Sequence, residues 1–139
     1  MTSELGAQVS ALVDILCVDD EPNALMLEKE LLESAGFRVS TASSGPEAIR
    51  VFESKRVDMV IMDYWMAGMN GITAAQKIKQ LKPDVPIIFY SAYTELSSET
   101  LGIAEYWIKK NEEDPEQILA RLRNLAEKQQ QSARLRQAS

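Results

Sequence analysis

The chain has 139 residues, of which 45% are hydrophobic and 26% charged, a composition typical of one globular domain. Its net charge of −6 disfavours nucleic-acid binding by this domain, and no apolar stretch is long enough to predict a membrane span. A single cysteine excludes an intramolecular disulfide, and the absence of histidine excludes histidine catalysis, histidine metal ligands and histidine phosphorylation.

Short apolar runs alternate with helical patterns after an N-terminal arm, residues 1–13, which lacks the basic start of a signal peptide. The runs that predict strands are residues 14–18, 37–41, 57–62, 86–90 and 104–108. Pro22 suits the first turn of the first helix. Ala24, Leu27 and Leu31 recur there at helical spacing, which predicts that they form its apolar face.

The later helices have their own signals. Ser44 is the expected cap of the second helix, and Gly71 lies in the turn before the third. Asp114 and Gln117, on either side of Pro115, predict a capping box at the start of the last helix. Residues 94–101 leave room for at most two helical turns, so the fourth helix is expected to be short, irregular or absent.

Five strands alternating with helices predict an α/β fold, with a parallel sheet that is doubly wound by helices on both faces. We expect residues 14–126 to form this domain and residues 127–139, which are rich in glutamine, to form a C-terminal helical tail or linker. Folds of this class bind ligands at the carboxyl ends of their strands.

The informative polar residues follow the predicted strands. Asp19 and Asp20 come after the first, Asp63 after the third, Ser91 after the fourth and Lys109 after the fifth. The carboxyl ends of parallel strands share one edge of the sheet, so these side chains are expected to converge. Clustered carboxylates repel unless a cation is present, and Mg²⁺ prefers oxygen ligands. Carboxylates, Mg²⁺, an ammonium and a hydroxyl are the groups that phosphoryl transfer uses.

At these positions the chain resembles the receiver domain of response regulators in two-component signalling, and in particular single-domain chemotaxis regulators. The motifs that carry the resemblance are VDDEP at 18–22, DYWMAGMNG at 63–71, YSA at 90–92 and YWIK at 106–109. The resemblance covers residues 14–125 and implies the flavodoxin-like receiver fold.

The resemblance also implies roles for individual residues. It makes Asp63 the phosphoacceptor and Mg²⁺ the cofactor, with the metal held by Asp19, Asp20, Asp63 and the backbone carbonyl of Trp65. It gives phosphoryl-binding and switch roles to Ser91, Ala92, Tyr106 and Lys109. The side chains that flank the water attacking the phosphoryl group are Trp65 and Tyr93. Because both are large and aromatic, we predict slow self-dephosphorylation.

The chain departs from the family pattern at three places. Ala67 and Lys110 stand where the family usually has proline, and the connection from Ser91 to Lys109 is short. A cis bond before a residue other than proline costs about 2.5–4 kcal/mol, which favours a trans bond between Lys109 and Lys110, but the sequence leaves its conformation open. The short connection also puts the family's usual dimer surface in question.

The resemblance implies a cytoplasmic phosphorylation switch that is not an enzyme beyond its own phosphoryl transfer and slow dephosphorylation. Its partners would be a sensor histidine kinase or phosphotransfer protein and an unknown output partner. The alternative is a pseudo-receiver, a protein-binding module that works without phosphorylation. A phosphatase of the haloacid-dehalogenase type is rejected, because its acidic residues occur in a different order. The sequence leaves open the cognate kinase, the stimulus, the oligomeric state and whether the chain is part of a longer protein.

Overall fold

The computed structural model describes residues 13–64, 66, 70–91, 102–110 and 114–138. Several expectations lie outside these residues: the N-terminal arm, the Trp65 carbonyl, the Ala67 departure, the roles of Ala92 and Tyr93, and the short or absent fourth helix. The bond between Lys109 and Lys110, whose conformation the sequence leaves open, is trans, and so is every other peptide bond in the described part of the chain.

A five-stranded parallel sheet forms the centre of the domain, with the strand order β2-β1-β3-β4-β5. This confirms the predicted doubly wound α/β fold. The strands are β1 (Asp14–Val18), β2 (Arg38–Ala42), β3 (Met59–Met62), β4 (Ile87–Ser91) and β5 (Tyr106–Lys109). The observed strands agree with the predicted ones to within two residues at most ends, because continuous apolar runs bounded by polar residues are typical of buried parallel strands.

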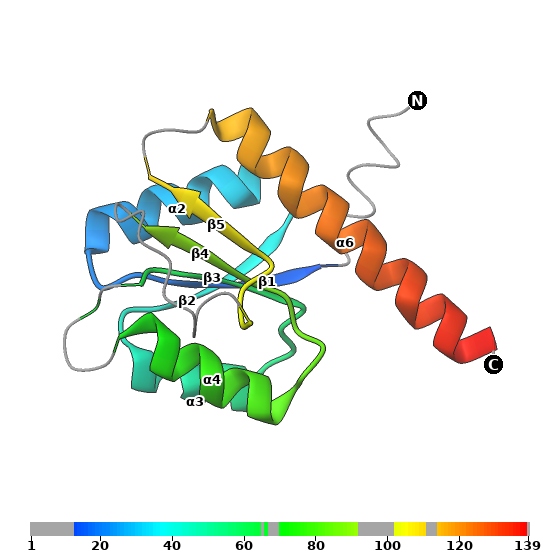
Figure 1. Cartoon of the computed structure of the whole chain (residues 1–139). Coiled ribbons are helices and arrows are strands. Elements are labelled where there is room, and N and C mark those ends of the chain that lie inside the picture. The colour runs from blue at the N-terminus through cyan, green and yellow to red at the C-terminus, as the bar shows by residue number, and fades with distance from the viewer. Residues whose placement is uncertain (1–12, 65, 67–69, 92–101, 111–113, 139) are drawn as a thin grey trace.

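Helices cover both faces of the sheet, as Figure 1 shows. The four helices in the described part of the chain are α2 (Pro22–Ser34), α3 (Gly45–Ser54), α4 (Gly71–Leu81) and α6 (Pro115–Ala138). One core cluster joins the sheet to α3 and α4, and a second joins it to α2 and α6. We refer to these as the α3/α4 face and the α2/α6 face. None of these helices is both long and apolar enough to cross a membrane.

Alternation along β4 shows how one strand serves both faces. Ile87 and Phe89 belong to the α3/α4 core, whereas Ile88 and Tyr90 belong to the α2/α6 core. Ile87, Ile88 and Phe89 are all fully buried. Successive strand residues point to opposite sides, so an uninterrupted apolar run fills both layers at once.

Two predicted caps are confirmed. The Ser44 hydroxyl accepts a hydrogen bond from the Glu47 backbone N–H at the start of α3. At the start of α6, the Asp114 backbone N–H donates to the Gln117 side chain at 3.3 Å, which is the expected capping box.

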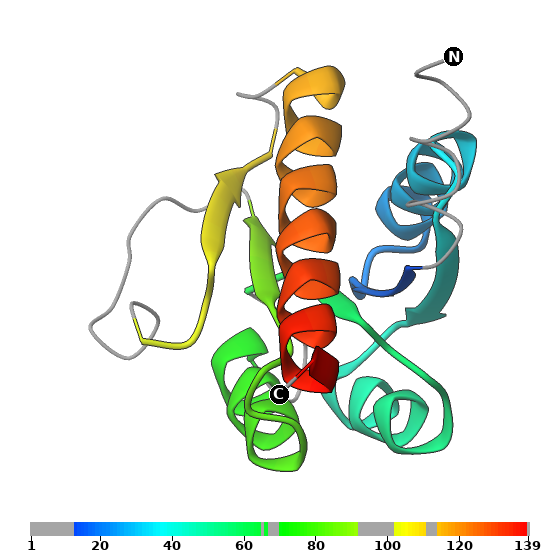
Figure 2. The same ribbon diagram turned by 90° about the vertical axis from the view of Figure 1, so that its right-hand side faces the viewer.

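Helix α6 lies on the α2/α6 face and continues past the sheet (Figures 1 and 2). Ile118, Leu122, Leu125 and Ala126 pack into the core, and the helix then runs on to Ala138. Residues 127–138 belong to this same helix. The division of the chain at residue 126 stays a prediction.

The apolar face of α2 differs from the predicted one. Leu27 is 63% exposed, whereas Leu25, Glu28 and Leu32 are turned toward the sheet, Leu25 and Leu32 packing in the α2/α6 core. Leu31, which was predicted to face the core, lines the cavity between α2 and the sheet, so the observed face is rotated from the predicted one only far enough to leave Leu27 outside. The consequence is that a carboxylate, Glu28, lies inward.

Candidate functional site

Three carboxylates converge at the carboxyl edge of the sheet, as the sequence predicted. Asp19, Asp20 and Asp63 each offer an oxygen, and these oxygens all lie within 4.8 Å of one another. Asp19 is buried, Asp63 is partly buried and Asp20 is exposed. The cluster thus has one anchored carboxylate and one side open to solvent.

The sheet register brings these residues together. Val18 is paired with Met62, so the residues that follow them emerge side by side. The Asp63 backbone N–H donates to the Val18 carbonyl at 2.9 Å, and the Asp19 backbone N–H donates to the Ala42 carbonyl at 3.2 Å. These bonds extend the sheet by one residue and fix the backbone under both carboxylates.

Lys110 supplies the positive charge of this cluster. Its Nζ lies 2.6 Å from Asp19 Oδ2 and 3.7 Å from Asp63 Oδ2, and 5.6 Å from the centre of the Tyr90 ring. Burial lowers the pKa of the Lys110 ammonium, but the hydrogen bond to Asp19 and the charge of Asp63 outweigh it. The net pKa is raised, so the ammonium stays protonated.

Lys110 was not among the site residues predicted from the sequence, although a signal for it was present. Two aromatic residues precede two lysines at the same spacing: Tyr106 before Lys109, and Trp107 before Lys110. In β5, Lys109 is paired with Ser91, and Lys110 follows with its backbone N–H donating to the Ser91 carbonyl at 2.8 Å. Successive residues point to opposite faces, so only a known register decides which lysine meets Asp19. The predicted role of Lys109 is not tested by this geometry.

The aromatic residues of β5 divide between the two faces. The Trp107 ring packs on the α3/α4 face, with its centre 5.3 Å from that of Tyr64 and 5.4 Å from that of Phe89. Tyr64 directly follows Asp63, so the Trp107 ring contacts the residue next to the predicted phosphoacceptor. Tyr106 belongs to the α2/α6 core instead, with its ring 5.3 Å from the guanidinium carbon of Arg121.

Ser91 is fully buried at the end of β4. Because side chains alternate along the strand, it shares the α3/α4 side with Phe89 and the register partner of Phe89, Trp107. The structure therefore groups Ser91 with Trp107 and does not bring Tyr106 to that side. The switch role of Tyr106 and the phosphoryl-binding role of Ser91 stay predictions.

Glu28 is a further titratable residue near the site, and it was not predicted from the sequence. Burial raises the pKa of its carboxyl to about 8, and the negative charges of Asp19 and Asp63 add to this effect while Lys110 opposes it. Its carboxyl group is accordingly mostly protonated at neutral pH.

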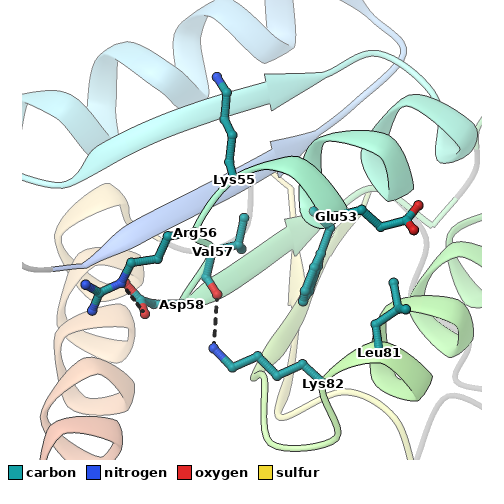
Figure 3. Close-up of a pocket in the computed structure, with 8 residues that line it drawn as sticks. Glu53, Lys55, Arg56, Val57, Asp58, Leu81 and Lys82 are labelled. Atoms are coloured by element: carbon teal, nitrogen blue, oxygen red, sulfur yellow. Dashed lines mark hydrogen bonds and ion pairs between the residues drawn. The ribbon is translucent and has the colours of Figure 1, made fainter.

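A surface pocket of about 670 Å³ lies at the amino ends of the strands, at the opposite edge of the sheet from the acidic cluster (Figure 3). Two of the three cations that line it, Lys82 and Arg56, are engaged. Lys82 Nζ donates to the Val57 carbonyl at 3.2 Å, and Arg56 pairs with Asp58 at 3.4 Å. The ends of α3 and α4 border this pocket, and cations near helix C-termini are favourable there. These contacts indicate that Lys82 and Arg56 stabilise the fold.

A doubly wound domain with three carboxylates and an ammonium at the carboxyl edge has the architecture of a signalling receiver. Residues 15–123 match the family model of the response regulator receiver domain. The chain therefore belongs to the response regulator receiver domain family of two-component systems.

Curated relatives agree with this assignment. The chain is 34% identical over 116 residues to an uncharacterized transcriptional regulatory protein, YbdJ, of Bacillus subtilis strain 168, covering 81% of this chain and 50% of that protein. It is 36% identical over 101 residues to the transcriptional regulatory protein ZraR of Escherichia coli K12, covering 70% of this chain and 23% of ZraR. The chain thus spans between about a quarter and a half of the length of these two relatives.

Solved structures show the same fold. The response regulator TrrA from Thermotoga maritima, in a complex with Mg²⁺ and BeF, is 34% identical with a TM-score of 0.76, over 81% of this chain and 98% of TrrA. A CheY-like receiver domain protein from Methanospirillum hungatei is 25% identical with a TM-score of 0.82, over 86% of this chain and 98% of that protein.

Proposed function

We propose that this domain is a phosphorylation switch in which Asp63 accepts a phosphoryl group from a histidine kinase or phosphotransfer protein in the presence of Mg²⁺. The observation that carries this proposal is the convergence of Asp19, Asp20 and Asp63, with the Lys110 ammonium beside Asp19 and Asp63. Since these 139 residues contain no histidine, the phosphodonor lies outside this domain, on a phosphohistidine or a small phosphorylated molecule.

The donor set fits Mg²⁺. Three carboxylates within 4.8 Å of one another are hard oxygen ligands, and one side of the cluster is open for waters and phosphate oxygens. Asp19 and Asp20 would hold the ion, together with Asp63 and the predicted Trp65 carbonyl. When bound, Mg²⁺ would offset the negative charge of the phosphoryl oxygens. The relative TrrA was solved with Mg²⁺ and BeF, which supports this cofactor.

In the transfer step, a carboxylate oxygen of Asp63 forms a bond to phosphorus while the bond from phosphorus to the donor nitrogen breaks. The donor nitrogen leaves with the electron pair of that bond. A partly buried carboxylate beside a persistent ammonium is suited to this attack, because the ammonium stabilises the oxygens that gain negative charge.

We propose further that Lys110, in place of Lys109, meets the phosphoryl oxygens, because its ammonium already lies between Asp19 and Asp63. The two adjacent lysines form a matched pair for mutation. Lys110→Ala should be phosphorylated more slowly and should lose the response of the protein to the phosphoryl group, whereas Lys109→Ala should retain most of both. If Lys109→Ala had the larger effects instead, Lys109 would be the residue that meets the phosphoryl oxygens.

The central test uses a small phosphodonor. Purified protein is incubated with Mg²⁺ and phosphoramidate or acetyl phosphate, and its intact mass is measured. Wild type should gain one labile phosphoryl group and Asp63→Asn should gain none. Asp84→Asn is a suitable control, because Asp84 is an exposed carboxylate at the opposite edge of the sheet. Equal labelling of wild type and Asp63→Asn would refute the proposal. Wild type that binds Mg²⁺ but accepts no phosphoryl group would favour a pseudo-receiver.

A further inference from the structure

Glu28 lies in an environment that is unusual for a carboxyl group. It projects from α2 toward the sheet and lines a small cavity of about 20 Å³, enough for about one water molecule. Apart from Glu28 and Tyr90, every residue that lines this cavity is leucine or isoleucine. A carboxyl group with such neighbours has few polar partners to compensate for burial.

The charged groups that act on Glu28 are those of the phosphorylation site. Asp19, which follows β1, and Asp63, which follows β3, raise its pKa, and the buried thiol of Cys17 on β1 is a titratable neighbour. Tyr90 lies on β4, and Lys110 follows β5. Helix α6 presents only Ile118 and Leu122 to the cavity. On α2 itself, Lys29 is paired with Glu33 at the surface.

Lys110 is shared between these acidic groups. Its ammonium is bonded to Asp19 and lies near Asp63, and Glu28 attracts it as well. When Glu28 carries a charge, it competes with Asp19 and Asp63 for that ammonium and adds negative charge near the cluster. Both effects favour the uptake of a divalent cation by the carboxylates.

We propose that Glu28 is a positioning residue for Lys110, and that its ionisation is coupled to Mg²⁺ uptake by Asp19, Asp20 and Asp63. This inference rests on the proposed function. In the protonated form, Glu28 leaves Lys110 with Asp19 and Asp63, where the ammonium opposes a second cation. In the ionised form, Glu28 draws Lys110 toward α2 and the carboxylates bind Mg²⁺ more tightly.

The coupling has a definite sign. If ionised Glu28 tightens Mg²⁺ binding, then bound Mg²⁺ must by reciprocity lower the pKa of Glu28 and release its proton. The pKa of about 8 for the Glu28 carboxyl places the release of this proton near neutral to mildly alkaline pH, where the raised pKa of Lys110 keeps its ammonium protonated. Glu28 is then the source of a pH dependence of Mg²⁺ affinity between neutral and mildly alkaline pH.

The test is a calorimetric Mg²⁺ titration of the full chain at about pH 6.5 and about pH 9, in buffers of different ionisation enthalpy. Wild type should bind Mg²⁺ about fivefold or more tightly at the higher pH, and near pH 8 it should release a fraction of a proton for each ion bound. Glu28→Gln keeps the size and polarity of the side chain but cannot ionise, so both effects should disappear. Glu30→Gln, which alters an exposed glutamate on the same helix, should behave as wild type.

A second measurement follows Glu28 directly. The carboxyl carbon resonance of Glu28 should titrate near pH 8 without metal and at lower pH with Mg²⁺. Glu28→Gln that retains the wild-type pH dependence, or a Glu28 resonance that ignores Mg²⁺, would overturn the inference while the proposed function stands. If wild type, Glu28→Gln and Glu30→Gln all fail to bind Mg²⁺, the proposed function itself fails and this inference with it.

Discussion

Replacing Gly71 with alanine tests how tightly the phosphoacceptor backbone is held. A Cβ atom at this position would lie 2.4 Å from the Asp63 carbonyl oxygen, 2.9 Å from Phe89 Cε1 and 3.0 Å from Tyr64 Cα. The Gly71 backbone N–H also donates to the Tyr64 carbonyl at 2.7 Å, which closes the loop after Asp63. The added methyl group must therefore displace main chain or a fully buried ring.

Two opposing contributions set the size of the effect. Forcing an extra methyl group into a packed site costs about 1–3 kcal/mol, and the upper end applies because two of the three neighbouring atoms are main chain. Alanine is better than glycine in a helix by about 1 kcal/mol, and Gly71 is the first residue of α4. We expect a net loss of about 2 kcal/mol in the free energy of unfolding.

The measurement is urea denaturation of wild type, Gly71→Ala and Gly102→Ala. Gly102 is the matched control, because a Cβ atom there meets no other atom within 4 Å and should change stability by less than about 0.5 kcal/mol. Gly71→Ala should also slow the phosphorylation of Asp63, since the shifted carbonyl belongs to that residue. If Gly71→Ala had wild-type stability and phosphorylation, the neighbouring atoms would be able to move at little cost. The predicted clash with the added Cβ atom would then be wrong.

The other predictions concern charge and water. Because the pKa of Glu28 rises from 4.5 to about 8 on folding, stability should fall as pH rises between these values and level off above. The full shift corresponds to about 5 kcal/mol at about 1.4 kcal/mol per tenfold change in proton affinity, which partial exposure reduces to roughly 2; urea denaturation across this pH range should show the fall in wild type and not in Glu28→Gln. Titration with Mg²⁺ should change tryptophan fluorescence in wild type, and Asp20→Ala should abolish the change; an unaltered response would place the metal elsewhere. Loss of label from phospho-Asp63 should be slow, and several-fold faster in Trp65→Asn/Tyr93→Glu; equal decay would mean that the rings do not limit the access of water.

The sequence predicts most of the fold because its signals are local. Apolar runs of strand length specify the sheet, and Ser44 and Asp114 have the side chains that cap helices. Other caps were missed. Glu21 accepts hydrogen bonds from the first turn of α2, but glutamate is not among the preferred capping residues. Asn70 caps α4 in the same way, but it lies among glycines that indicate a turn.

The acidic site was predictable for a different reason. Asp19, Asp20 and Asp63 lie at strand ends, and the order of parallel strands brings them together without any knowledge of side-chain packing. The side-chain directions of Lys110 and Glu28 depend instead on how β5 and α2 are rotated about their own axes. A slip of one residue in β5 exchanges Lys109 for Lys110, and a turn of about 100° in α2 exchanges Leu27 for Glu28. Composition and spacing do not fix such rotations, because either choice leaves an acceptable apolar pattern.

The length of α6 has a mechanical consequence. Its first turns are held in the α2/α6 core through Leu122 and Leu125, and the last helical residue, Ala138, lies 13 positions beyond Leu125. At a rise of about 1.5 Å per residue, Ala138 lies about 20 Å along the helix axis from Leu125, and a tilt of about 5° at the base of the helix moves this end by roughly 2 Å. Any change that rotates the base of α6, where it packs against β4 and β5, is thus converted into a larger displacement outside the domain.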